Sequence, residues 1–163
     1  MKRLGRTGIA AMAVLLLLVP VGCTDGQDHL DKAREAHKTG QLAEATKEYT
    51  AAIDSGDLAP DALADAHRSR GDIYRKVGPD TAALADYTNA IKLDPADASA
   101  YRHRGVIYTR TGQFAQALAD CTRVIELAGT DPEAWHARGL LHVWMGDPAK
   151  ANADFARADA LRP

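Results

Sequence analysis

Two cysteines and six histidines are the side chains in this sequence best suited to nucleophilic or metal chemistry. His136 and His142 stand six residues apart, whereas two ligands on one face of a helix need a spacing of three or four. The sequence contains no G-x-S-x-G, P-loop or H-E-x-x-H motif. It therefore predicts no catalytic residue, no metal site and no cofactor, and we expect a protein that is not an enzyme.

Cys23 follows a segment with the organisation of an export signal. Three basic residues precede an apolar run over residues 9–19, which is shorter than the roughly 20 apolar residues of a membrane-spanning helix. Gly22 and Cys23 resemble the end of a bacterial lipobox, although Pro20 stands where such sequences usually have leucine. The resemblance implies a signal peptide over residues 1–22, a lipidated Cys23 and a polar tether to residue 28. Ordinary cleaved secretion and an uncleaved anchor are the alternatives.

The charge balance argues against a nucleic-acid partner. The formal net charge is −2, and the first 22 residues hold three basic residues and no acidic one, so the rest of the chain is more acidic still. A nucleic-acid-binding domain would instead carry a basic stripe. The chain is rich in alanine and only 6% aromatic, which favours helices over strands.

A repeat with a period of 34 residues occupies most of the chain after residue 60. The recurring columns hold Gly71, Gly105 and Gly139; Gly78, Gly112 and Gly146; Ala83, Ala117 and Ala151; and Leu93, Leu127 and Leu161. An earlier segment carries Gly40, Ala45 and Tyr49 at matching spacing, with four extra residues before the next copy, and we interpret it as a degenerate first repeat. Periods of this length are typical of solenoids, in which each unit buries its apolar face only by stacking on its neighbours.

A 34-residue period with glycine, alanine and an aromatic residue in this order resembles the tetratricopeptide-repeat (TPR) family. The resemblance covers residues 27–163 and implies an all-α, right-handed superhelical solenoid of stacked antiparallel helix pairs. It comprises about four repeats, near 26–57, 64–97, 98–131 and 132–163. We expect helices at 26–39, 41–54, 60–77, 80–93, 97–111, 113–127, 132–145 and 148–161.

Two kinds of column in the repeat have a structural interpretation. The resemblance implies that Gly71, Gly105 and Gly139 in the first helix of a repeat (helix A) let the second (helix B) approach, with Ala83, Ala117 and Ala151 opposite them. Arginine and aspartate columns are expected to pair across each helix hairpin, as Arg70–Asp86, Arg104–Asp120 and Arg138–Asp154. If exposed, such pairs contribute about 0–1 kcal/mol each. A residue that recurs in every copy has a scaffolding role, since a catalytic residue would occur once.

The last copy has the pattern of a terminal repeat. Leu84 and Leu118 occupy a helix B column that we expect to pack on the following repeat. The same column holds Asn152 in the last copy, so its outer face is polar, as in a repeat that ends an array. Cys121 falls in a core column, where we expect a buried and unreactive thiol.

In TPR proteins, helix A lines a concave groove, and the corresponding positions here change character along the chain. The expected partner-binding residues are Arg68, Arg75, Lys76, Arg102, Arg110, His136, Leu140 and Trp144. The arginines could orient an acidic segment or could form an ordinary solvated face. Trp144 could anchor a partner side chain or could be a shielded aromatic at the end of the array. The groove lacks the asparagine of the TPRs that clamp a terminal carboxylate, so we do not expect that subtype.

These patterns predict an exported scaffold that mediates protein–protein interaction. Lipidation of Cys23 would make it a membrane-anchored bacterial lipoprotein facing the periplasm or the cell exterior, with a role in envelope assembly or maintenance. The expected partner is another protein or a peptide. The alternatives are a self-associating structural protein, in which a homo-oligomer fills the groove, and an accessory subunit that binds a peptidoglycan or glycan fragment.

Overall fold

The computed structural model describes residues 25–162, and in this range the chain forms eight helices and no strand. The helices are α1 (Asp25–Lys38), α2 (Leu42–Asp54), α3 (Pro60–Val77), α4 (Asp80–Leu93), α5 (Ala98–Arg110), α6 (Phe114–Leu127), α7 (Pro132–Trp144) and α8 (Pro148–Leu161). Every helix expected from the repeat is present, and its ends lie within one residue of the prediction. The predicted signal peptide and Cys23 lie outside the described residues.

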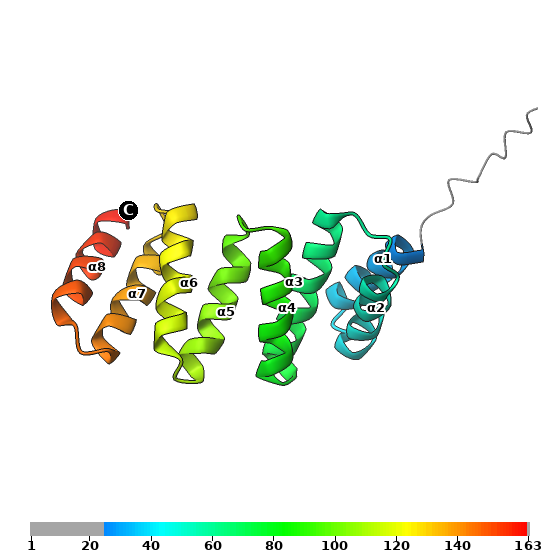
Figure 1. Ribbon diagram of the computed structural model, residues 1–163, viewed down its shortest axis with the longest axis horizontal. Coiled ribbons are helices and arrows are strands. Elements are labelled where there is room, and N and C mark those ends of the chain that lie inside the picture. The colour runs from blue at the N-terminus through cyan, green and yellow to red at the C-terminus, as the bar shows by residue number, and fades with distance from the viewer. Residues whose placement is uncertain (1–24, 163) are drawn as a thin grey trace, which may run out of the picture.

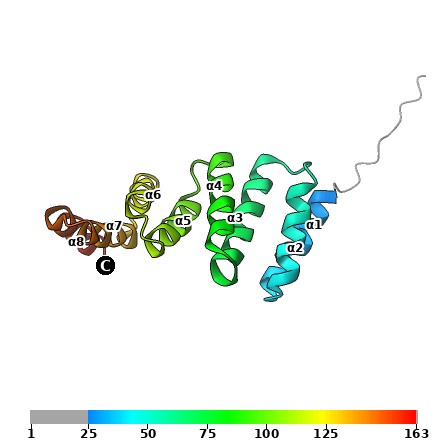
Figure 2. The ribbon, with the colours of Figure 1, turned by 60° about the horizontal axis from the view of Figure 1, so that its bottom comes forward.

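The helices follow one another along the long axis of the molecule in chain order (Figure 1). Each packs against its partner in the hairpins α1–α2, α3–α4, α5–α6 and α7–α8, and successive hairpins meet through α2–α3, α4–α5 and α6–α7. The view in Figure 2 shows the same succession, with the hairpins progressively rotated about the long axis. The structure is therefore the predicted α-solenoid.

Local sequence explains where the helices begin and end. Asp97, Asp131 and Asp147 each precede a helix and accept hydrogen bonds from backbone N–H groups of its first turn. Gly112, between α5 and α6, has a φ of 75°, and Gly146, between α7 and α8, has a φ of 78°. These left-handed conformations favour glycine and allow the tight turn inside a hairpin.

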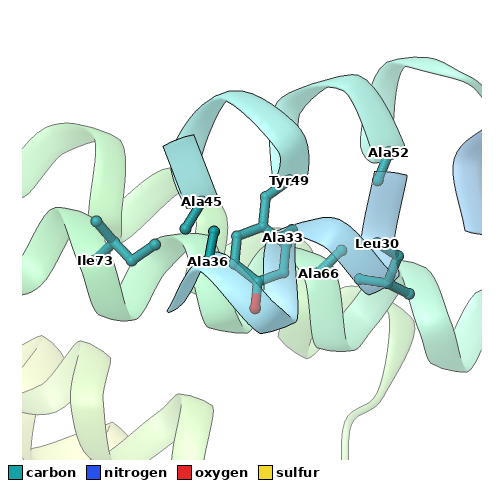
Figure 3. Close-up of a cluster of buried hydrophobic side chains, with 8 residues drawn as sticks. All are labelled: Leu30, Ala33, Ala36, Ala45, Tyr49, Ala52, Ala66 and Ile73. Carbon is teal, nitrogen blue, oxygen red and sulfur yellow. The ribbon is translucent and has the colours of Figure 1, made fainter. Parts of the chain in front are cut away.

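Small residues bring the helices of the first repeat close together. Leu30, Ala33, Ala36, Ala45, Tyr49, Ala52, Ala66 and Ile73 form a buried cluster that joins α1, α2 and α3 (Figure 3). The ring of Tyr49 fills the space between alanines from all three helices. Because neighbouring repeats share such clusters, the stability of each hairpin depends on the next.

The glycine and alanine columns that recur in the repeats lie where helix A and helix B approach each other closely. A Cβ added to Gly71 would lie 3.1 Å from the Tyr87 ring, and one added to Gly139 would lie 2.6 Å from the Phe155 ring. At Gly105 the nearest neighbour would be the Cβ of Asp120, at 3.3 Å, and not Ala117, whose carbonyl oxygen is 3.8 Å away. The alanine column is fully or almost fully buried at Ala83, Ala117 and Ala151.

The three predicted arginine–aspartate pairs are confirmed, but they are not surface pairs. Each arginine donates two hydrogen bonds to one carboxylate, at 2.8 and 2.8 Å for Arg70–Asp86, 2.9 and 2.7 Å for Arg104–Asp120, and 2.8 and 2.8 Å for Arg138–Asp154. The aspartates are buried, being at most 5% exposed. Breaking a buried bidentate pair destabilises a fold more than breaking a solvated pair, since it leaves an uncompensated buried charge.

Candidate functional site

An apolar pocket lies between α5, α6 and α7, on the face formed by α3, α5 and α7, which we call the A-helix face. Its volume is about 180 Å³. Its floor is made of Gly105, Cys121, Val124, Ala134 and Leu141, which are buried or half-buried. Its rim is made of Arg102, Val106, Thr109, Glu133, Ala137, Leu140 and Trp144.

Trp144 borders the pocket at the C-terminal end of α7. It is 54% exposed, so it is not part of the core. One side of its ring packs against Phe114 at the start of α6, with ring centroids 5.6 Å apart and planes inclined by 33°. The ring is therefore supported by a neighbour and still presents a large apolar surface to solvent, and its role as an anchor for a partner stays a prediction.

The arginines of the A-helix face are already engaged by aspartates. Arg68 contacts Asp65 and also reaches Asp97, the N-cap of α5, at 3.1 Å. Arg102 contacts Asp131, the N-cap of α7, in the same way one repeat later. These contacts run from helix A of one repeat to the start of helix A in the next.

The remaining two arginines are also paired. Arg110 contacts Asp80, at the start of α4. Arg75 lies 3.9 Å from an oxygen of Asp72 and donates to the Tyr87 hydroxyl at 3.3 Å. Aspartates of this chain therefore lie within ion-pair distance of all four arginines, and an acidic segment would compete with these contacts. That the arginines orient such a segment stays a prediction.

Asp72 is the centre of a polar network between α3 and α5. It accepts a hydrogen bond of 2.7 Å from the Tyr87 hydroxyl. His103 Nδ1 lies 2.7 Å from the same carboxylate oxygen, but the two groups are poorly aligned for a hydrogen bond. Burial by itself would raise the pKa of Asp72, but His103, Tyr87 and the nearby Arg75 together lower it. The lowered pKa keeps the Asp72 carboxylate ionised at neutral pH, where Tyr87 and Arg75 of the same chain stabilise its charge.

The structure brings only some of the predicted groove residues together. Arg102, Leu140 and Trp144 all line the pocket. Lys76 is exposed near the end of α3. His136 is half-buried against the Phe155 ring, with centroids 5.3 Å apart, and does not line the pocket.

Phe114 and Cys121 contribute to the site in ways that the sequence did not predict. Val106 is 50% exposed on the rim, and Phe114 supports Trp144 from another helix. Val106 occupies a helix A position that the TPR resemblance places in the groove, in the column that holds Asp72 in the previous repeat, whereas no local signal marks Phe114. Cys121 is half-buried in the pocket floor and not fully buried as expected. Burial and the neighbouring Asp120 carboxylate raise the pKa of its thiol to about 11, which keeps it protonated.

Within residues 25–162, no group of three or more His, Cys, Asp or Glu side chains is placed to hold a metal ion. In the same range, no helix combines the length and the hydrophobicity needed to cross a bilayer.

Two family models match the chain. One, described as a TPR repeat, matches residues 71–112, and another, described as a tetratricopeptide repeat, matches residues 98–131. None of the curated protein sequences compared with the chain matches it.

Several solved structures have the same fold. A crystal structure of MamA superposes with a TM-score of 0.76 at 20% identity, covering 85% of this chain and 78% of MamA. YrrB, described as a TPR protein with an unusual peptide-binding site, gives 0.73 at 18% identity, covering 85% and 69%. The second TPR of Spaghetti (RPAP3), bound to the HSP90 peptide SRMEEVD, gives 0.57 at 29% identity, covering 61% and 92%. The repeat pattern, the stacked hairpins and these matches together show that the chain is a tetratricopeptide-repeat protein.

Proposed function

We propose that this protein is an exported scaffold, anchored to a membrane through a lipid on Cys23, whose A-helix face binds another polypeptide. The observation that carries the binding proposal is the open apolar pocket between α5 and α7. We propose no catalytic role for it.

The apolar surface around the pocket is larger than packing of the repeats requires. Val106, Leu140, Val143 and Trp144 are between 38% and 54% exposed, and all lie on α5 or α7. The neighbouring Met145 is 47% exposed. Contiguous exposed apolar side chains rimmed by polar ones are typical of interaction surfaces. A partially supported tryptophan is also a common anchor in such surfaces.

Related folds support a polypeptide as the ligand class. YrrB is described as having a peptide-binding site, and the second TPR of Spaghetti is bound to a peptide. A solenoid offers an extended surface that suits a chain segment better than a small compact molecule.

A photo-crosslinking amino acid at Thr109, on the pocket rim, tests the binding proposal in the native envelope. We expect it to capture a discrete polypeptide, and the same probe at Ala119, exposed on α6 outside the pocket, to capture none. Trp144→Ala should remove the crosslink while the helical circular dichroism is retained, because the ring is 54% exposed. Equal capture from both positions, or a crosslink unaffected by Trp144→Ala, would count against the pocket as the binding surface.

The same experiment separates the alternatives. A crosslink between two copies of this chain, with a dimer in light scattering of the purified protein, would indicate self-association. A muropeptide that protects Trp144 fluorescence from quenching, in the absence of any captured polypeptide, would indicate a glycan-binding subunit.

Export and anchoring are tested at Cys23. Acyl chains supply membrane affinity of about 0.8 kcal/mol per buried CH₂, so Cys23→Ala should release the protein from membranes or leave it unprocessed. Unchanged processing together with unchanged membrane fractionation would exclude the lipid anchor.

A further inference from the structure

We infer that the pocket takes an uncharged segment that inserts one aliphatic or aromatic side chain, and that it does not select an acidic segment. This inference rests on the proposed function and adds the chemical class of the ligand. It follows from the charges around the pocket and from its size and lining.

The one arginine on the pocket rim is committed to holding two repeats together. Arg102 bonds to Asp131, and Asp131 at the same time caps α7 by accepting the backbone N–H of Glu133. An acidic ligand could recruit Arg102 only by replacing this contact, which would leave the Asp131 carboxylate without its cation. The net gain from a charge exchange of this kind is small, because one pair is broken for each pair made.

The other charged group on the rim disfavours an anion. Glu133 has a side chain that is 67% exposed, and the cation that it contacts is Arg162, also on the surface, at 3.4 Å. Like charges at an interface lower affinity and exclude the wrong partner. A neutral segment meets no such repulsion.

The pocket has the size and lining for one apolar side chain. Its volume of about 180 Å³ is slightly larger than that of an apolar cavity of about 150 Å³ that binds benzene in an engineered protein. The floor consists of Val124, Leu141 and small residues, and Leu140 and Trp144 rise beside it. A leucine, methionine or phenylalanine side chain would displace poorly held water and contact apolar atoms on most sides.

The two tryptophans of the chain provide a reporter and an internal control. Trp144 borders the pocket, whereas the indole N–H of Trp135 donates to the Gly129 carbonyl at 2.9 Å, away from the pocket. In a ¹H–¹⁵N spectrum of the mature protein, N-acetyl-leucinamide and N-acetyl-phenylalaninamide should shift the Trp144 signal and leave that of Trp135 in place. We expect saturation in the millimolar range, as for other ligands of this size.

Charge and salt decide the ligand class. N-acetyl-aspartate amide and the acidic peptide SRMEEVD should shift the Trp144 signal by less than one-tenth of the shift that the neutral compounds give. Raising the salt concentration to about 0.5 M should not weaken the neutral compounds, because screening acts only on charge interactions.

A variant that fills the pocket from outside tests the location without disturbing the core. Ala137 lines the pocket and is exposed, so Ala137→Phe should abolish the Trp144 shift while the unfolding midpoint is retained. Ala119→Phe, on the exposed surface of α6, is the matched control and should bind like the parent.

The outcomes separate this inference from the function on which it rests. Stronger binding of SRMEEVD than of the neutral compounds, lost at high salt, would overturn the inference while a crosslinked polypeptide at Thr109 still supported the scaffold. Capture of a polypeptide at Thr109 without any response to the neutral compounds would also overturn it. Absence of both capture and response would refute the scaffold itself.

Discussion

The buried pair Arg70–Asp86 offers the sharpest test of how this solenoid is stabilised. Asp86 is 2% exposed and accepts two hydrogen bonds of 2.8 Å from Arg70 and one of 2.9 Å from His67. Arg70 in turn donates to Thr50 of the previous repeat at 2.8 Å. The carboxylate therefore holds Arg70 and His67 within its own hairpin, and orients the bond from Arg70 to the previous hairpin.

Asp86→Ala should strongly destabilise the protein. It leaves the guanidinium of Arg70, whose side chain is only 15% exposed, without its counter-ion. Breaking one partner of a buried pair costs about 3–5 kcal/mol, and the partial exposure of Arg70 favours the lower end, about 3 kcal/mol. For a domain of this size the melting temperature should fall by roughly 6–12 °C.

Urea unfolding followed by circular dichroism at the helical minimum measures this effect. Asp86→Asn keeps the shape and one acceptor, so it should lie between the parent and Asp86→Ala. Glu126→Ala is the control, because it removes one partner of an exposed pair with Arg123 and should leave the midpoint nearly unchanged. If Asp86→Ala is no more destabilising than Glu126→Ala, the buried ladder does not stabilise the array as argued.

Three further predictions concern acid, packing and thiol chemistry. Burial opposes the ionisation of Asp86, but bonds from Arg70 and His67 overcome this effect and lower the pKa of its carboxyl group. Asp86 therefore adds stability above the unfolded pKa of about 3.9, and this stability is lost as pH falls through the folded pKa. The urea midpoint should be nearly independent of this group above about pH 5, fall below about pH 4, and fall less in Asp86→Ala. Gly139→Ala should lower the free energy of unfolding by about 1–3 kcal/mol, because the added Cβ would lie 2.6 Å from Phe155. Gly105→Ala, whose Cβ would lie 3.3 Å from its nearest neighbour, should be nearly neutral. Equal unfolding midpoints for the two variants would contradict this. In a Cys23→Ser variant, Cys121 should react slowly with iodoacetamide at pH 8, because the pKa of its thiol is raised to about 11. The rate should increase about tenfold per pH unit up to pH 10. Fast alkylation at pH 7, measured by mass spectrometry, would refute the raised pKa.

The sequence alone determined the architecture, because the glycine, alanine, arginine and aspartate positions that shape a hairpin recur with the 34-residue period. Gly71 and Asp86 have equivalents in each later copy, so one helix-pair geometry accounts for all of them. Turn glycines and N-cap aspartates set the helix ends locally, which is why the predicted boundaries lie within one residue of those observed. The three buried arginine–aspartate pairs could be predicted for the same reason, since both residues recur in each of the last three copies.

Only the tertiary structure decided the character of the candidate site. The contact Arg102–Asp131 spans 29 residues and Arg110–Asp80 spans 30, so each joins different hairpins. Such contacts depend on the rotation between successive hairpins, which no single repeat specifies. From the sequence, the arginines stood as a basic cluster, because Asp97, Asp131 and Asp80, which contact Arg68, Arg102 and Arg110, lie outside the helices that carry these arginines. The pocket beside Trp144 is likewise formed by three helices of two repeats, so it depends on how α7 stacks on the preceding hairpin. Periodicity predicts the contacts that every hairpin makes with itself, whereas the surface between hairpins is set by the stacking of the whole array.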